Sequence, residues 1–190
     1  MAQATTRLSG VTYAVSNTGP LISAFQSKSY ELLARIFAEI HTSSICVMEL
    51  RQHGWDEAIK AASSSLVIVE LTSEEESRAL HIAEQIAQHS SAPYAPVSDH
   101  LGEAQAIVLA LRPEYQNDLL LLDELAARKV AKEQNSKLSG FPGVLLLAVQ
   151  VGLISAEDLR ARLEVCQQRG THYGNTFIQQ VFEMAKQGRR

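Results

Sequence analysis

Short apolar runs alternate with longer segments of helical period along the chain. The run LLLL at 119–122 is fully apolar and of strand length, as expected for a central parallel strand that is covered on both faces. We predict strands at 13–16, 43–46, 66–71 and 119–122, and the run at 43–46 is the weakest of them. This alternation is typical of an α/β protein with a parallel sheet.

The segments between these runs have the spacing and the boundary residues of helices. Pro113 and Gly152 stand where two of the helices should end, and the S-x-x-E spacing from Ser73 to Glu76 is that of a capping box. The predicted helices span 18–25, 30–40, 47–62, 74–88, 101–111, 124–134, 142–151, 155–168 and 176–187. A loop rich in Ser and Pro, 90–100, is the main linker. We expect one domain over 1–190, in which 155–190 is a C-terminal helical extension.

Composition limits the function classes further. A chain of 190 residues can bury a core without disulfides, and Cys46 and Cys166 do not have the spacing of a zinc site. The net charge of −4 argues against a broad basic face that would bind nucleic acid through phosphate neutralisation. No apolar run reaches the length of a membrane span, and the polar start MAQATTRLSG lacks the form of a signal peptide. We therefore expect a soluble, cytoplasmic protein with no membrane partner.

Polar side chains cluster at the predicted junctions between strands and helices. Asn17 follows the first strand, Asp123 follows LLLL, Glu49 begins the helix after the weak strand, and Glu103 lies near the start of an almost apolar helix. Ligands bind outside the carboxyl ends of parallel strands, so these positions are candidates for a site. Taken singly, Asp123 could be a helix N-cap, Glu49 a solvated residue and Glu103 an acid favoured by the helix dipole. Converging carboxylates repel one another, so as a group they favour a bound Mg²⁺ or Mn²⁺ ion.

Four stretches, in this order, resemble the motifs of the PIN-domain nucleases. They are VSNTGPLI at 15–22, VMEL at 47–50, LGEAQAIVLAL at 101–111 and DLLLLDELAARKVA at 118–131. The run LSGFPGVLLLAVQVGLI and the tail around RGTHYGNTFIQQVFEMA are similar to the C-terminal half of the branch whose first motif is Ser-Asn-Thr-Gly-Pro. The resemblance therefore covers nearly the whole chain.

The resemblance implies a three-layer α/β/α, Rossmann-like fold and a metal-dependent ribonuclease that hydrolyses RNA phosphodiesters. Many such proteins are toxins of toxin–antitoxin pairs, which implies a small antitoxin protein as a partner. The implied metal ligands for Mg²⁺ or Mn²⁺ are Asn17, Glu49, Glu103 and Asp123, with Asp99 as a weaker addition. Glu49, Glu103 and Asp123 are also the implied catalytic residues.

Further residues would support this site. Ser16 and Thr18 would orient Asn17 or the phosphate, and Arg128, about one turn into the helix after Asp123, could reach a phosphate oxygen. Most PIN domains have Asp where this chain has Asn17, although Asn is usual in this branch. Asn17 thus favours the alternative of a catalytically silent domain that binds RNA or a protein partner, whereas the three carboxylates favour the enzyme.

Two structural expectations follow from these assignments. The strands ending at Ser16 and Leu122 should be neighbours at the centre of the sheet, because both lead into polar junctions. We also expect a homodimer formed through apolar helical faces, because pairing lengthens the substrate groove of a protein with negative net charge.

Overall fold

A computed structural model describes residues 12–90 and 96–188. The polar start of the chain and residues 91–95 of the loop predicted at 90–100 lie outside the described residues. Among the described residues, no helix is both long enough and apolar enough to cross a bilayer.

The described part of the chain forms one five-stranded parallel sheet with the order β3-β2-β1-β4-β5. Its strands are β1 (Tyr13–Ser16), β2 (Glu39–Ser43), β3 (Leu66–Val69), β4 (Leu119–Leu121) and β5 (Leu138–Ser139). β1 lies at the centre and pairs with β4, with Ser16 opposite Leu121. The predicted adjacency of these two strands is confirmed, so the junctions that follow them lie at the same edge of the sheet.

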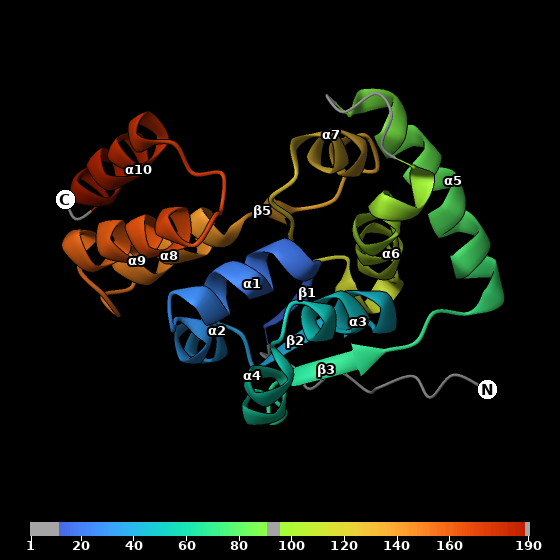
Figure 1. Ribbon diagram of the computed structural model, residues 1–190, viewed down its shortest axis with the longest axis horizontal. Helices are drawn as coiled ribbons and strands as arrows, with labels where there is room; N and C mark the ends of the chain where they lie inside the picture. Colours follow the sequence, from blue (N-terminus) through green and yellow to red (C-terminus); the bar gives the residue numbers. More distant parts are fainter. Residues whose placement is uncertain (1–11, 91–95, 189–190) are drawn as a thin grey trace.

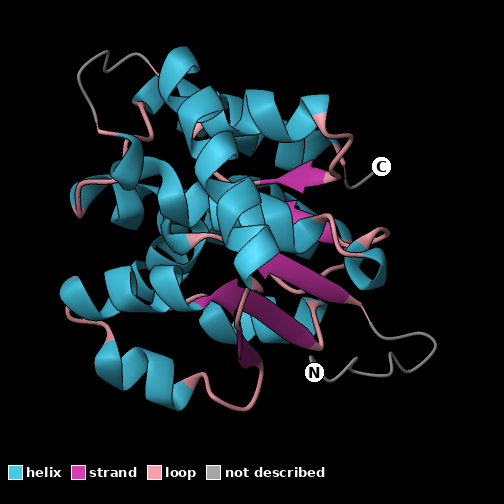
Figure 2. Ribbon diagram, turned by 90° about the vertical axis from the view of Figure 1, so that its right-hand side faces the viewer, coloured by secondary structure: helices cyan, strands magenta, loops and turns pink. Residues whose placement is uncertain are grey.

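Helices cover both faces of the sheet (Figures 1 and 2). The α-helices are α1 (Thr18–Gln26), α2 (Tyr30–Ile36), α3 (Ser44–Gln52), α4 (Asp56–Ala61), α5 (Ser73–His89), α6 (Leu101–Ala110), α7 (Leu125–Glu133), α8 (Phe141–Gln150), α9 (Ala156–Gln168) and α10 (Asn175–Gln187). Short 3₁₀ turns, η1 (Val97–His100) and η2 (Pro113–Tyr115), precede α6 and β4.

The side chains of β1 alternate between two apolar layers in the described part of the chain. Ala14 belongs to a core cluster that includes residues of α1, α2, α8, α9 and α10, whereas Val15 belongs to a second cluster that includes residues of α5, α6 and α7. Successive strand residues point to opposite faces of a sheet, so one central strand contributes to both layers. The result is the expected three-layer α/β/α fold.

The chain between the first and third strands differs from the prediction. The helix expected over 30–40 ends at Ile36, and β2 begins at Glu39, before the weak strand predicted at 43–46. Phe37 is already extended (φ −113°, ψ 132°), which ends the helix. Ser43 then accepts a hydrogen bond from the Cys46 amide and caps α3, so 44–46 is helical.

Two smaller expectations also change, and the structure contains one strand that was not predicted. The single helix predicted over 47–62 is divided into α3 and α4, because Gly54 adopts a left-handed conformation (φ 79°) between them. The capping box of α5 is formed by Thr72 and Glu75, one residue earlier than predicted. The two-residue strand β5 was not predicted, since it is too short to leave an apolar pattern.

Candidate active site

Asn17 connects β1 to α1 and occupies the N-cap position of that helix, but its side chain makes no capping hydrogen bond. The side-chain nitrogen Nδ2 instead donates to Glu103 Oε1 at 3.4 Å. The other side-chain atom, Oδ1, is buried and has no hydrogen-bond partner among the described residues. Asn usually caps a helix in this position. The side chain is therefore directed into the site, where a buried oxygen lacks a partner.

Glu103 lies in the first turn of α6, beside Asn17. The pKa of the Glu103 carboxyl is raised from 4.5 to about 7. Burial is the largest cause and the charges of Glu49 and Glu124 act in the same direction, whereas hydrogen bonds from a backbone N–H and from the Asn17 amide oppose the increase. This acid therefore lies in a partly dehydrated and negatively charged environment. Such an environment favours either a bound proton or a cation.

Glu49, on α3, accepts a hydrogen bond from the hydroxyl of Thr18. Its carboxylate lies directly against the first turn of α6, because a Cβ at Gly102 would lie 2.9 Å from Glu49 Oε1. Asn17, Glu49 and Glu103 thus come together from the junction of β1 and α1, from α3 and from α6. Glycine before Glu103 in the sequence LGE is what allows this approach.

Asp123 follows β4 and lies near Asn17, but its carboxylate has other partners. A Cβ at Gly19 would lie 3.9 Å from both Asn17 Oδ1 and Asp123 Cβ, so the two residues flank the start of α1. Asp123 Oδ1 accepts a hydrogen bond from the Phe141 amide at 3.0 Å, and Oδ2 accepts one from the Tyr173 hydroxyl at 3.1 Å.

The contacts of Asp123 affect both the ionisation of its carboxyl group and its availability as a metal ligand. Burial raises the pKa of Asp123, and the two hydrogen bonds and the charge of Arg128 oppose this increase. Within the described residues, no three His, Cys, Asp or Glu side chains form a ready-made metal site. The structure brings Asn17, Glu49 and Glu103 together and leaves the Asp123 carboxylate turned toward Phe141 and Tyr173.

The remaining predicted residues have different surroundings. The Ser16 hydroxyl donates to the Asn17 carbonyl at 2.9 Å. Arg128 Nη1 donates to the carbonyls of Leu122 (2.6 Å) and Ser139 (3.0 Å), so this nitrogen ties the end of β4 to the end of β5. Asp99 lies in η1, where it is exposed and accepts a hydrogen bond from Ser98.

Two residues of the site were missed by the sequence analysis. Glu124, not Asp123, is the N-cap of α7, because its carboxylate accepts a hydrogen bond from the Ala127 amide at 2.6 Å. The adjacent acids in LLDEL could have indicated this alternative. Tyr173 holds Asp123 from a turn 50 residues further along the chain, and no local pattern marks it.

The comparisons with known proteins agree with this geometry at the level of the family. The family model described as a PIN domain matches residues 13–187. No curated protein and no solved structure matches the chain. PIN domains are generally nucleases. Since the match covers nearly the whole length, from β1 to the end of α10, the chain belongs to the PIN-domain family.

Proposed function

We propose that this protein is a metal-dependent endoribonuclease that hydrolyses RNA phosphodiesters. The observation that carries the proposal is the buried Asn17 Oδ1, which lacks a partner among the described residues and lies in the same side chain that contacts Glu103. An oxygen without a donor beside an acid of raised pKa is chemically suited to a cation. Glu49, Glu103 and Asp123 are the proposed catalytic acids.

The available ligands fit a hard divalent ion such as Mg²⁺ or Mn²⁺. Both ions take oxygen ligands, and Asn17, Glu49 and Glu103 offer an amide oxygen and two carboxylates. Asp123 would complete the set if its carboxylate left Phe141 and Tyr173. When bound, such an ion lowers the pKa of a water molecule and neutralises charge on the phosphate.

The chain's own residues would prepare this chemistry. The hydroxyl of Thr18 fixes the orientation of the Glu49 carboxylate, and the hydroxyl of Ser16 fixes the backbone of Asn17. Arg128 holds the ends of β4 and β5 together and contributes positive charge near Asp123. These are orienting roles, which keep the ligand oxygens in place before substrate arrives.

A toxin role with a small antitoxin protein and a homodimeric assembly complete the proposal. The resemblance of the sequence motifs to a family with many such toxins supports the first, and the exposed apolar side chains of Met48 and Val151 are compatible with the second. The second candidate function is a silent PIN domain that binds RNA or protein without cleaving. The neutral Asn17 and the engaged Asp123 carboxylate favour that candidate.

An assay of cleavage with single-stranded RNA separates the two candidate functions. We expect cleavage with Mn²⁺ or Mg²⁺, none with a chelator, and a strong reduction in Asp123→Asn. Asp56→Asn is the matched control, because Asp56 is exposed in the first turn of α4, and it should cleave like the wild type. If the wild type binds RNA but cleaves none with either metal, the silent domain is the correct interpretation.

Asn17→Asp should bind Mn²⁺ more tightly than the wild type. The substitution adds a negative charge at the position of the amide, and Coulombic attraction to a divalent ion increases accordingly. If the protein is a nuclease, cleavage at limiting Mn²⁺ should also increase. Calorimetry measures the affinity, and an unchanged affinity would mean that Asn17 does not contact the metal.

A further inference from the structure

A large cleft lies beside Asp123, and its lining differs in chemical character from the polar group formed by Asn17, Glu49 and Glu103. Its volume is about 710 Å³, which falls within the range of small-molecule sites. The start of α7, the segment from β5 into α8, and α10 with the turn before it form its walls. The lining side chains are predominantly apolar or aromatic; they include Leu125, Leu138, Leu146, Tyr173, Phe177 and Met184.

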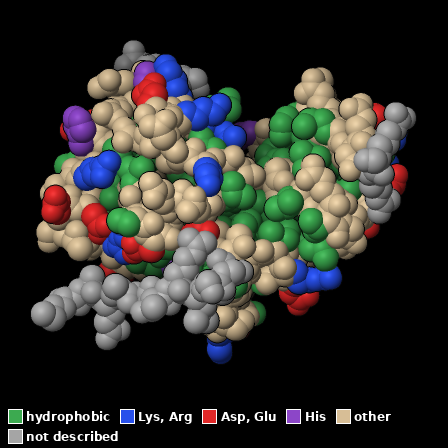
Figure 3. Space-filling view, turned by 180° about the vertical axis from the view of Figure 1, so that it is seen from behind, with side chains coloured by type: hydrophobic (Ala, Val, Ile, Leu, Met, Phe, Trp, Pro, Cys, Tyr) green, Lys and Arg blue, Asp and Glu red, His purple; other side chains and the backbone are tan. Residues whose placement is uncertain are grey.

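An aromatic pair forms one wall of the cleft. The rings of Tyr173 and Phe177 are stacked, with centroids 5.7 Å apart and an interplanar angle of 28°. Phe177 is 40% exposed and Met184 is 57% exposed, so the wall is open to a ligand. Figure 3 shows that hydrophobic side chains gather over the C-terminal helices. A flat apolar ligand could extend this stack.

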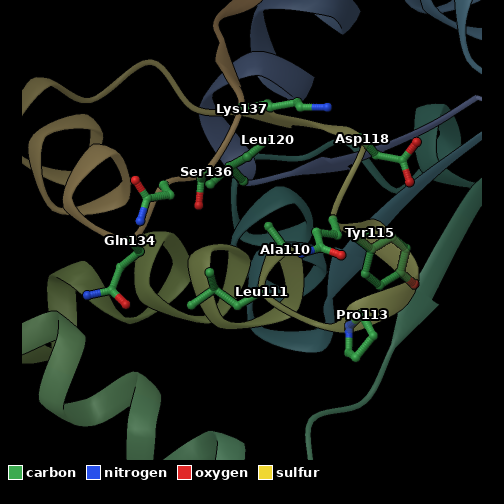
Figure 4. Close-up of a pocket in the computed structure, with 11 residues that line it drawn as sticks. Ala110, Leu111, Pro113, Tyr115, Asp118, Leu120, Gln134, Ser136 and Lys137 are labelled. Atoms are coloured by element: carbon green, nitrogen blue, oxygen red, sulfur yellow. The ribbon is translucent and has the colours of Figure 1, made fainter.

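The cleft is continuous with the candidate active site. Asp123 and Arg128 line it, and the Tyr173 hydroxyl donates to Asp123 Oδ2 at 3.1 Å. A second cavity, of about 270 Å³, is different: it is lined by Asp118, Leu120 and Lys137, near the opposite end of β4 (Figure 4). A ligand in the larger cleft would therefore lie next to Asp123, whereas one in the smaller cavity would not.

We propose that the larger cleft binds an unstacked base of single-stranded RNA, next to the phosphate that is cleaved. The inference rests on the proposed ribonuclease function and deepens it. Bases in single-stranded RNA are recognised by stacking on aromatic side chains. The lining is mainly apolar and aromatic, with Asp123, Arg128 and His172 as its acidic and basic groups, so it suits a planar base better than a phosphate.

The charge of the whole protein supports the same assignment. The net charge of −4 argues against a broad basic face that would bind RNA through phosphate neutralisation. Base stacking supplies affinity that does not depend on positive charge. The cleft would therefore provide binding energy that does not require such a basic face, and it would select the position of cleavage.

Binding of a fluorescent RNA tests this inference. The probe is a single-stranded oligoribonucleotide with 2-aminopurine at one position at a time, bound to the full-length Glu103→Gln protein to prevent cleavage. We expect the fluorescence to change at one position, because the base there leaves its neighbours in the RNA. In this background Phe177→Ala should abolish the fluorescence change and weaken binding roughly 5- to 100-fold, whereas Phe177→Trp should preserve the binding. Leu80→Ala is the control, because Leu80 is 50% exposed on α5 and does not line the cleft.

An abasic nucleotide makes the test specific for the base. Removing the base at the position where the fluorescence changes should weaken binding to the Phe177-containing protein and should have no further effect in Phe177→Ala. Thermal unfolding of each variant identifies any loss of folding. Equal binding by Phe177→Ala and Leu80→Ala, or a fluorescence change at no single position, would overturn the proposal.

Other occupants of the cleft give different results. If Phe177→Ala binds RNA normally but changes a dimer into a monomer in light scattering, a second copy of the chain occupies the cleft and the proposal is wrong. Cleavage by the wild type with Mn²⁺ is measured in parallel. A fluorescence change at one position without cleavage would refute the nuclease and keep the base site, whereas cleavage without any such change would refute the base site alone.

Discussion

Replacing Glu103 with Gln is expected to reduce metal-dependent cleavage roughly 100-fold or more, since even residues that only orient metal ligands cost 10- to 100-fold. The same substitution should make the metal-free protein more stable at pH 8. The raised pKa of Glu103 means that the fold disfavours its charged form. Glutamine has the shape of the protonated acid, so it removes this cost and can still accept the hydrogen bond from Asn17.

The sign of the pH dependence follows from the two pKa values. Below 4.5, Glu103 is protonated in both the folded and the unfolded chain, and its charge costs nothing. As the pH rises from 4.5 to about 7, the unfolded chain releases the proton and the folded chain retains it, so the wild type loses stability. Above pH 7 the difference is complete, and it amounts to about 3 kcal/mol at most.

Chemical denaturation at pH 4.5 and pH 8 measures this effect. The gain in stability of Glu103→Gln over the wild type should be present at pH 8 and largely absent at pH 4.5, and added Mn²⁺ should reduce it by stabilising the wild type. Glu76→Gln is the matched control, because Glu76 lies in the first turn of α5 and is exposed. It should lose a few tenths of a kcal/mol, about what the helix dipole provides. A Glu103→Gln protein that is less stable than the wild type at pH 8 would show that the carboxylate has a partner that stabilises its charge.

The sequence predicted the parts of the fold whose patterns are local. Apolar runs with polar ends marked β1 and β4, and their adjacency followed from the rule that central parallel strands are covered on both faces. β2 was misplaced because its buried side chains are largely polar. His41 bonds Tyr115 and Glu39, and Thr42 bonds the Ser16 carbonyl, so these groups are satisfied by partners that no local pattern reveals.

The candidate site was predictable to the same degree. Asn17, Glu49 and Glu103 were expected together because each follows or begins an element at one edge of the sheet, and they meet there. The orientation of Asp123 was not predictable, since it depends on the Phe141 amide and on Tyr173. The metal site itself stays a prediction.

Gly140→Ala should destabilise the protein by about 1–3 kcal/mol, the usual cost of forcing extra volume into a packed site. A Cβ at residue 140 would lie 2.2 Å from Asp123 Oδ1, so the carboxylate would have to move and would lose its bond to the Phe141 amide. The backbone is not the cause, because Gly140 is extended (φ −129°, ψ 177°) and any residue can adopt that conformation.

Gly174→Ala is the matched control for this effect. Gly174 is also a glycine at a helix N-cap, with φ −71° and ψ 155°, but a Cβ there would meet nothing within 4 Å. Chemical denaturation should therefore give Gly174→Ala a cost of about a few tenths of a kcal/mol. In an Asp123→Ala background the obstructing carboxylate is gone, so Gly140→Ala should cost no more than Gly174→Ala. If Gly140→Ala is as harmless as Gly174→Ala with Asp123 present, the Asp123 carboxylate does not lie against Gly140, and its assigned hydrogen bond to the Phe141 amide is wrong.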